Sequence, residues 1–360
     1  MKKSHLIVIF IIVCLYCMPD AGQSCTSFGL NQDELHLFGK NLDWDLDDGL
    51  VFINKRGALK KAIPAQNDNG EPVSWKSKYG SITFNQYGRE IAMGGMNEAG
   101  LTVETMVLGM SQYPPPDARP YIPKFQWQQY QLDTAGTVAE VIDSLMKIRV
   151  SGGGKGPGVH FLVIDKTGVC AAIEFLNGKT VVHTRETLPI KVLTNSTYTQ
   201  SLETFNQTLN QAKESFANLS SSLYRFVTAA DMIKRYDDKN TIPTIDNVFH
   251  ILKKVSQGRQ TKWSIAYDIG NLKIYFRTYA NPKIRHINLK AFDFTCQTPV
   301  KVLGINAKLE GDVSAAFTDY TQSANRKLIG EAFRKTSFLR NVPVEELDQL
   351  SRYPEETICE

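Results

Sequence analysis

The chain has 360 residues, 42% of them hydrophobic and 22% charged, which leaves enough length to bury one large core or two smaller ones. Its formal net charge of +4 is small and dispersed, and no basic stripe is interleaved with aromatic residues. This charge pattern argues against a nucleic acid as a partner.

The first 24 residues have the order of a secretory signal peptide. Two lysines precede an unbroken apolar run at 6–18, which is followed by a proline and a short polar stretch. The run is too short for a comfortable membrane span, and the small residue Ser24 stands directly before Cys25. We therefore expect residues 1–24 to be removed and the mature chain to begin at Cys25, in the periplasm or the extracellular space. An uncleaved anchor is the alternative; no later segment is apolar enough to span a membrane.

The region after Cys25 is predicted to open with short strands separated by turns. The predicted strands are residues 27–30, 35–39, 50–54, 81–84 and 102–108. Helical periodicity follows at 125–133 and 137–148, after a rigid proline-rich break. A glycine-rich segment at 151–158 lacks the arrangement of a phosphate-binding loop, so we expect a surface or lid segment there.

The second half is predicted to combine an antiparallel meander, helices and a hairpin. The meander comprises 159–164, 169–175 and 180–184, with Asn177-Gly178 as its best hairpin signal. The predicted helices are 201–214, 223–236, 245–255, one from 315 to about 336 and a short acidic one after Pro343; a second hairpin joins 261–267 to 272–279. Antiparallel strands alternating with helix pairs indicate an α+β layered domain.

Four cysteines remain after the predicted leader: Cys25, Cys170, Cys296 and Cys359. Because this number is sparse for an exported protein, a disulfide scaffold is not expected to hold the fold. If Cys25 stays free, at most one pair can form, and a Cys296–Cys359 pair would tie the C-terminus to the core. Cys170 lies in an apolar run and is expected in the core.

Cleavage before Cys25 would give one residue both a thiol and a free α-amino group. A thiol of ordinary pKa about 8.5 needs a base, and an α-amine of about 7.7–8.0 titrates close to working pH. The residue would therefore supply its own nucleophile and base, as in catalytic dyads built on an N-terminal residue. No histidine is required for this chemistry.

The histidines offer no better catalytic pattern. They show neither HExxH nor another metal-binding spacing, and the signature of a papain-like cysteine is absent. We interpret the five histidines after the predicted leader as surface or strand residues: His36, His160, His183, His250 and His286.

A cysteine that follows a leader is also found in bacterial lipoproteins. Lipoprotein processing prefers leucine three positions before the cysteine, whereas this chain has Gly22 there and Gln23 next. The match is poor, and a lipid-anchored binding protein that uses Cys25 as its anchor is kept as the alternative.

Several segments resemble the choloylglycine hydrolase and penicillin V acylase family of linear amide hydrolases, in its exported Gram-negative branch. They occur in family order over about residues 25 to 295: Cys25-Thr-Ser-Phe, 35–44, 75–80, 95–101, 192–196, 224–226 and 261–264. This resemblance implies the four-layer αββα sandwich of N-terminal-nucleophile hydrolases over residues 25–297, without a metal or cofactor. Residues 298–360 would be a partly helical C-terminal extension. A homodimer or homotetramer is implied as well.

The resemblance also implies roles for four residues. Cys25 matches the nucleophile, and Asp43 matches the carboxylate that hydrogen-bonds its amine. Asn195 matches the side-chain amide of the oxyanion hole. Arg225 matches the arginine that holds Asp43 and stabilises the thiolate. As alternatives, Asp43 could merely close a turn and Asn195 could form an Asx-turn.

The chain departs from the family at two of its positions. Lys40 stands where most members have arginine, so a point charge replaces a planar bidentate donor. Val107 stands where the best-known members have Asn or Tyr, which is harmless if only its backbone N–H serves the oxyanion hole. Trp44 and Trp75 are candidate walls of an apolar substrate pocket, or simple core residues.

The implied reaction is hydrolysis of a linear amide through a thioester at Cys25. The resemblance implies an apolar acyl group joined to a small polar amine, as in conjugated bile acids, penicillin V or N-acyl homoserine lactones. A catalytically inactive member that only binds such molecules is the second alternative.

Overall fold

The computed structural model describes residues 24–65, 68, 70–209, 219–238 and 242–359. The predicted signal peptide, apart from Ser24, lies outside these residues, as does the end of the helix predicted at 201–214. Within the described part of the chain, no helix is both long and apolar enough to cross a membrane.

The first large sheet has seven strands and carries the N-terminal hairpin. Its order is β14 (Val192–Leu193), β1 (Cys25–Gln32), β2 (Leu35–Asp43), β15 (Thr261–Asp268), β16 (Lys273–Thr278), β17 (Arg285–Asn288) and β19 (Gly311–Asp312). β1 to β17 pair antiparallel, and β14 pairs antiparallel with the outer side of β1. β1, which begins at Cys25, therefore lies between two strands rather than at a sheet edge.

The second large sheet has nine strands and is antiparallel throughout. Its order is β13 (Lys179–Thr184), β12 (Cys170–Leu176), β11 (Val159–Ile164), β8 (Thr102–Val107), β7 (Gly94–Asn97), β6 (Ser81–Asn85), β3 (Leu50–Asn54), β18 (Lys301–Gly304) and β20 (Thr318–Asp319). Smaller sheets pair β9 (Tyr121–Pro123) with β10 (Arg149–Ser151), and β4 (Ala58–Lys61) with β5 (Ser74–Lys76) and β21 (Ile358–Cys359).

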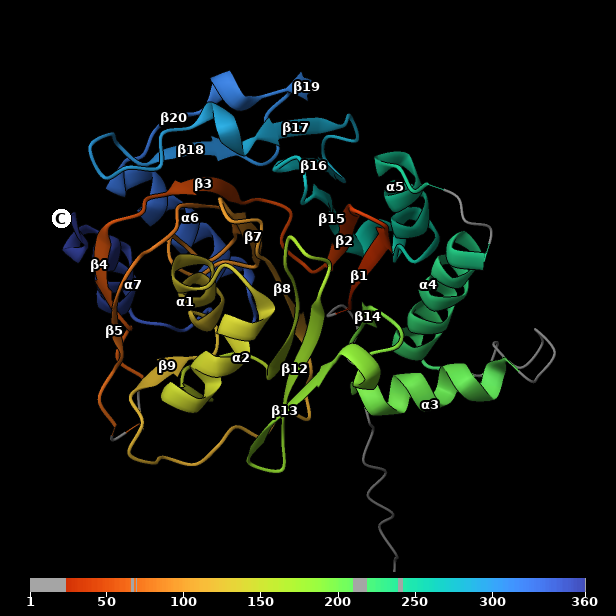
Figure 1. Cartoon of the computed structure of the whole chain (residues 1–360). Helices are drawn as coiled ribbons and strands as arrows, with labels where there is room; N and C mark the ends of the chain where they lie inside the picture. Colours follow the sequence, from red (N-terminus) through yellow and green to blue (C-terminus); the bar gives the residue numbers. More distant parts are fainter. Residues whose placement is uncertain (1–23, 66–67, 69, 210–218, 239–241, 360) are drawn as a thin grey trace, which may run out of the picture.

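Helices cover the outer faces of the two large sheets. α4 (Ser221–Asp238) and α5 (Ile245–Lys254) pack on the seven-stranded sheet, with α3 (Tyr198–Thr208) beside α4. α1 (Trp127–Thr134) packs on β7 and β8 of the other sheet, next to α2 (Val138–Lys147). Figure 1 shows these two helical groups on opposite sides of the strands. The predicted α+β fold with four αββα layers is confirmed.

Both faces of the central strands are covered. Successive side chains of such a strand are therefore buried in turn on one face of the sheet and on the other. On β11, Leu162 and Ile164 enter the core between the sheets, whereas Phe161 and Val163 enter the core beneath α1 and α2. Such strands appear in the sequence as continuous apolar runs. The predicted strand 159–164 matches β11 for this reason.

Turn and cap residues place several element boundaries where the sequence predicts them. Asn177 and Gly178 both have positive φ, 53° and 73°, and join β12 to β13 in the predicted hairpin. The Thr137 side chain accepts the Glu140 N–H in a capping box, which starts α2. Thr244 caps α5 in the same way.

The helix predicted from residue 315 is wrong at its start. α6 (Gln322–Lys335) begins after Thr321, whose side chain accepts the Ala324 N–H, and the preceding residues form β20. Pairing of β20 with β18 takes these residues out of the helix. α7 (Val344–Arg352) and a short 3-10 turn, η6 (Tyr353–Glu356), complete the tail.

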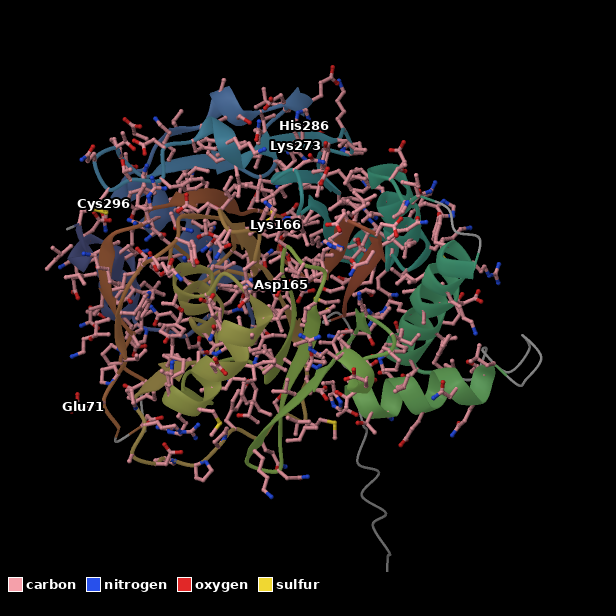
Figure 2. The ribbon with its side chains drawn as sticks, in the orientation of Figure 1. Glu71, Asp165, Lys166, Lys273, His286 and Cys296 are labelled. Carbon is pink, nitrogen blue, oxygen red and sulfur yellow. A yellow bond between two sulfur atoms is a disulfide. The ribbon has the colours of Figure 1, made fainter. Side chains whose placement is uncertain are left out.

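The tail is also joined covalently to the rest of the molecule. Cys296 and Cys359 form a disulfide, the one pairing that the sequence left conceivable, and Cys25 and Cys170 are free and buried. Cys296 in Figure 2 lies on the side where Figure 1 marks the C-terminus.

Candidate active site

Cys25 is the first residue of β1 and lies beside the end of β2. It pairs with Leu42, so the backbone amide of the next residue, Asp43, hydrogen-bonds the thiol. The residue is 2% exposed, and this burial raises the pKa of the thiol. The nearby positive charge of Lys40 opposes that shift.

Asn195 reaches Cys25 because β14 pairs with β1. Leu193 lies opposite Ser27, which leaves Asn195 next to the start of β1. Its Oδ1 accepts the backbone N–H of Cys25 at 2.6 Å, and its Nδ2 donates to the carbonyl of Val107 at 2.8 Å. These partners fix the orientation of the amide, since Oδ1 faces donors and Nδ2 faces an acceptor.

Arg225 is fully buried on α4, which packs on β1. Its guanidinium donates to the Cys25 carbonyl, to Thr26 Oγ1 at 2.7 Å and to Asn195 Oδ1 at 2.9 Å. Burial lowers the pKa of this guanidinium, and the charges of Asp43 and Cys25 oppose the shift. One cation therefore ties β1 to the Asn195 loop.

The carboxylate of Asp43 lies at the same junction but has a different partner from the predicted one. Its Oδ1 accepts the Thr261 hydroxyl at 2.5 Å, while its Oδ2 is buried without a hydrogen-bond partner. In the full chain, the Cys25 nitrogen is a peptide amide with one hydrogen, and Asn195 takes that hydrogen. Burial raises the pKa of Asp43 to about 6, against the opposing hydrogen bond from Thr261 and the charge of Arg225.

Lys40 is buried between the two large sheets. Its Nζ donates to the carbonyl of Thr105 and lies 3.5 Å from Oε2 of Glu104. Tyr267 donates its hydroxyl to Oε1 of the same carboxyl. Burial raises the pKa of Glu104 to about 7, although the charge of Lys40 opposes this. Lys40 thus belongs to a polar bridge from β2 to β8.

A cavity of about 570 Å³ opens at Cys25. Apolar side chains from the strands and their connections surround the cysteine: Leu42, Trp44, Ile91, Met93, Val107 and Val159. The predicted loop at 151–158 contributes Gly153, Gly154, Lys155 and Pro157 and lies on the surface, as expected. This volume and lining are typical of a site for a small molecule with a large apolar part.

The two candidate tryptophans occupy different places. Trp44 lines the cavity, and its indole donates to the Tyr87 hydroxyl at 2.7 Å. Trp75 lies on β5 in the core beneath α1, where its indole donates to Asp133 at 2.8 Å. The structure therefore brings Trp44, but not Trp75, to the cavity that holds Cys25.

His160 and Glu174 support the site and were not singled out from the sequence. His160 is fully buried on β11, with Nε2 2.7 Å from the carbonyl of Thr194 and Nδ1 3.0 Å from Glu174. Burial would raise the pKa of Glu174, but hydrogen bonds from His160 and the Tyr198 N–H, with His183 Nε2 3.6 Å away, lower it to about 2. The sequence signal for this supporting pair was a histidine inside the apolar run 159–164. A polar side chain buried in such a run needs hydrogen-bond partners, which indicates a buried polar network.

Together these groups can carry out acyl transfer. They comprise a buried thiol, two cations that favour its thiolate, a carboxylate with a free oxygen and an amide that points its N–H toward the cavity side of β8. Within the described ranges, no cluster of three or more His, Cys, Asp or Glu is arranged to hold a metal ion.

Comparison with known proteins gives a consistent result. The model of the linear amide C–N hydrolases, choloylglycine hydrolase family, matches residues 25–302. Penicillin V acylase from Pectobacterium atrosepticum is 27% identical over 263 residues, which are 62% of this chain and 69% of that protein.

Two solved structures share the fold. Penicillin V acylase from Agrobacterium tumefaciens aligns with a TM-score of 0.68 at 24% identity, covering 82% of this chain and 98% of that chain. A mutant conjugated bile acid hydrolase from Clostridium perfringens aligns with a TM-score of 0.64 at 21% identity, covering 78% and 96%. With the match over residues 25–302, the chain belongs to the choloylglycine hydrolase family of linear amide C–N hydrolases.

Proposed function

We propose that the mature protein hydrolyses a linear, non-peptide amide through a thioester at Cys25. The observation that carries the proposal is the buried Cys25 at the wall of an apolar cavity, hydrogen-bonded to Asn195 and Arg225 through its backbone. The thiolate attacks the amide carbonyl, the amine leaves with a proton, and water then releases the acid and restores the thiol.

The α-amine created by removal of residues 1–24 is the proposed base. It takes the proton of the Cys25 thiol and later delivers it to the leaving amine. A free amine has more hydrogens than the peptide nitrogen has, and Asp43 Oδ2 is a buried acceptor without a partner. This supports a bond from the amine to Asp43 in the mature protein, in addition to the contact with Asn195.

The tetrahedral oxyanion needs donors that are already in position. We assign this role to the second hydrogen of Asn195 Nδ2 and to the backbone N–H of Val107. Valine at position 107 is compatible with the role because its side chain takes no part in it. Arg225 and Lys40 supply the positive charge that lowers the pKa of the Cys25 thiol against the effect of burial.

The proposed substrate has an apolar acyl group joined to a small polar amine. The similar proteins are named for penicillin V and conjugated bile acids, and an N-acyl homoserine lactone has the same construction. The cavity of about 570 Å³ lies within the range for drug-sized ligands, and the apolar side chains around Cys25 suit an acyl group. Trp44 is proposed as part of this acyl site.

Export and assembly belong to the same proposal. Removal of the leader is required because only then does Cys25 carry an α-amine. The order of charges and apolar residues before Ser24 supports secretion to the periplasm or beyond. A homodimer or homotetramer is expected from the resemblance to the family.

The test is hydrolysis of an amide panel by the purified mature protein. Penicillin V, glycine- and taurine-conjugated bile acids and N-acyl homoserine lactones are assayed with the wild type and with Cys25→Ala. We expect the wild type to cleave at least one class and Cys25→Ala to lose that activity by several orders of magnitude. A wild type inactive on every amide, or a fully active Cys25→Ala, would sink the proposal.

Intact mass separates this proposal from a lipid-anchored protein. A mature chain that starts at an unmodified Cys25 is expected, whereas a diacylglyceryl anchor adds a mass on the order of several hundred daltons. The burial of Cys25 among hydrogen-bonded strands supports the unmodified thiol, since an anchor would have to leave through the core.

A further inference from the structure

The cavity at Cys25 has a second wall, built by the C-terminal extension. Most of this wall lies beyond residues 25–302, the part of the chain that the family model covers. α6 and the segment that follows contribute Phe333, Phe338, Leu339 and Val342, and the end of the tail contributes Leu350 and Tyr353. These six side chains are apolar or aromatic, like those on the strand side of the cavity, and Glu346, Gln349 and Glu356 add polar groups to the same wall.

α7 presents one of its faces to the cavity. Glu346, Gln349, Leu350 and Tyr353 line it and recur at helical spacing of three to four residues. Leu347, on the same helix, is 9% exposed and lies outside the cavity lining. The orientation of α7 about its axis therefore places Leu350, and not Leu347, in the cavity lining.

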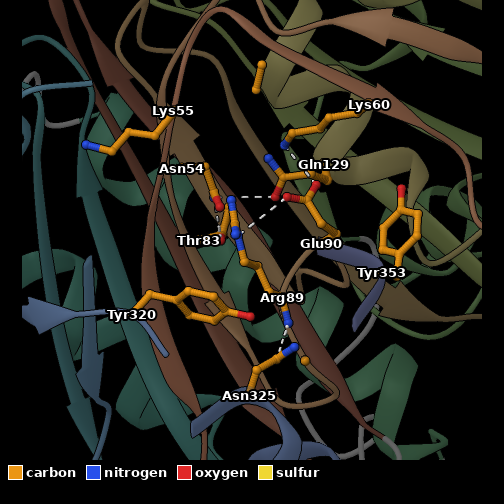
Figure 3. Close-up of polar contacts among 12 residues, drawn as sticks. Asn54, Lys55, Lys60, Thr83, Arg89, Glu90, Gln129, Tyr320, Asn325 and Tyr353 are labelled. Atoms are coloured by element: carbon orange, nitrogen blue, oxygen red, sulfur yellow. Dashed lines mark hydrogen bonds and ion pairs between the residues drawn. The ribbon is translucent and has the colours of Figure 1, made fainter. Parts of the chain in front are cut away.

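Polar contacts hold the extension against the strand side of the cavity. The Trp44 indole donates to Tyr87, whose hydroxyl lies 3.0 Å from that of Thr336. The backbone N–H of Arg89 donates to Asn325 Oδ1 at 2.9 Å, as Figure 3 shows. The Tyr87–Thr336 contact joins a cavity residue to the C-terminal end of α6, so the position of α6 is coupled to that of the site.

The end of the extension is fixed at the opposite side of α7. Tyr353 accepts a hydrogen bond from Gln126 at 2.5 Å and donates to the carbonyl of Lys61. β21 pairs with β4, and the disulfide from Cys359 to Cys296 closes the segment. The second wall is therefore a built part of the pocket rather than a loose tail.

We infer that the extension is the specificity-determining part of the acyl pocket and selects the acyl group by its length. This inference rests on the proposed function. The strand side binds the part of the acyl group next to the scissile carbonyl, because Cys25 lies among those residues. The apolar side chains of α6 and α7 then bind the remainder. Amides with an extended, flexible apolar acyl chain are the substrates that such a pocket favours.

The experiment measures acyl selectivity in the mature protein. Butanoyl, decanoyl and tetradecanoyl amides of one chromogenic amine are assayed with the wild type, Leu350→Trp, Leu350→Ala and Leu347→Ala. We expect Leu350→Trp to lower the ratio of kcat/KM between the tetradecanoyl and butanoyl amides by about tenfold, mainly through KM. Leu350→Ala should shift the ratio toward longer chains, and Leu347→Ala, matched in residue type and helix, should leave it within about twofold.

The same set of variants shows what would overturn the inference. An unchanged ratio in both Leu350 variants, or an equal change in Leu347→Ala, would exclude the extension as the selecting wall. A change in preference among amines at constant acyl group, without a change among acyl groups, would place the leaving amine there instead and equally refute the inference.

A binding measurement keeps this test separate from the proposed reaction. Calorimetry with Cys25→Ala and free tetradecanoate reports the acyl pocket without catalysis. Suppose that the wild type hydrolyses no amide, but that Leu350→Trp in the Cys25→Ala background weakens tetradecanoate binding about tenfold. The proposed function is then wrong, while the role of the extension in binding the acyl group is supported. If binding is the same with Leu350 and with Trp at that position, the wall is refuted whatever the enzyme hydrolyses.

Discussion

At the scale of single residues, the site is a set of side chains whose charges compensate one another. Burial raises the pKa of both the Cys25 thiol and the Asp43 carboxyl, while Lys40 and Arg225 oppose both shifts. Neither acid would ionise readily in this environment without the two cations. The ionisation of the thiol therefore depends on Lys40 and Arg225, which do not line the cavity.

Asp43 should give the enzyme a pH dependence near its own pKa. Because that pKa is raised to about 6, the carboxylate form of Asp43, which is proposed to hold the α-amine, is lost as pH falls below about 6, and kcat/KM should fall with it. Asp43→Asn should remove this limb of the pH profile and lower kcat/KM about 100-fold. Asp45, which is exposed, supplies the control, and Asp45→Asn should keep the acidic limb of the pH profile. If Asp43→Asn also keeps this limb, the assignment of the limb to Asp43 is wrong.

His160 should act on catalysis through Asn195. The imidazole holds the carbonyl of Thr194 and contacts Glu174, so His160→Ala frees the loop and leaves a carboxylate buried. We expect kcat to fall about tenfold with a smaller change in KM, since Asn195, the proposed oxyanion donor, is displaced. His160→Gln, which keeps a donor, should recover part of kcat. Equal kcat values for the two variants would show that His160 serves stability alone.

At the scale of elements, strand pairing brings together residues far apart in the chain. Register between β1 and β2 places Asp43 beside Cys25, and register between β14 and β1 places Asn195 there. α4 then adds Arg225 from outside the sheet. A shift of either register by one residue would turn these side chains to the other face of the sheet.

The disulfide should contribute to stability through the segment it closes. The bond joins residues 63 positions apart, and the chain-entropy model gives about 4 kcal/mol for a loop of that size. Cys359→Ser should therefore lower the Tm by about six degrees in a thermal melt. A reductant should produce the same shift in the wild type and none in Cys359→Ser; a Tm unchanged in both would show that the tail is held without the bond.

At the scale of the whole molecule, a buried polar bridge joins the two large sheets. Lys40 and Tyr267 reach across from the seven-stranded sheet to Glu104 and Thr105 on β8. The bridge costs desolvation and fixes the relative position of the sheets that enclose the cavity.

Glu104 should make stability depend on pH. Its pKa is 4.5 in an ordinary environment and about 7 in the folded protein, so the folded state binds more protons between these values. The free energy of unfolding should then fall as pH rises from about 4.5 to about 7, by about 3 kcal/mol from this group. Relative to Glu104→Gln, urea unfolding should show the wild type losing stability over that window. Exposed Glu186→Gln should show no such difference, and a pH-independent offset for Glu104→Gln would contradict the pKa.

The fold class, most element positions and Cys25 as the proposed nucleophile could be read from the sequence alone. Apolar runs, the Asn177-Gly178 turn and the capping residue Thr137 act locally, so a linear pattern records them. Cys25 was recognisable because the leader and the first strand adjoin it. Asp43, Asn195 and Arg225 were recognised from the resemblance to a family, because no periodic pattern along the sequence indicates that these three residues lie close together.

Only the tertiary structure decided which groups these residues touch. The partner of the Cys25 nitrogen, the support of Thr194 by His160 and the place of Trp75 away from the cavity depend on contacts between distant segments. The tail is the largest case: its first residues join a sheet rather than a helix, and α7 turns Leu350 into the cavity. Packing of elements against one another sets such contacts, and periodicity along one element cannot encode them.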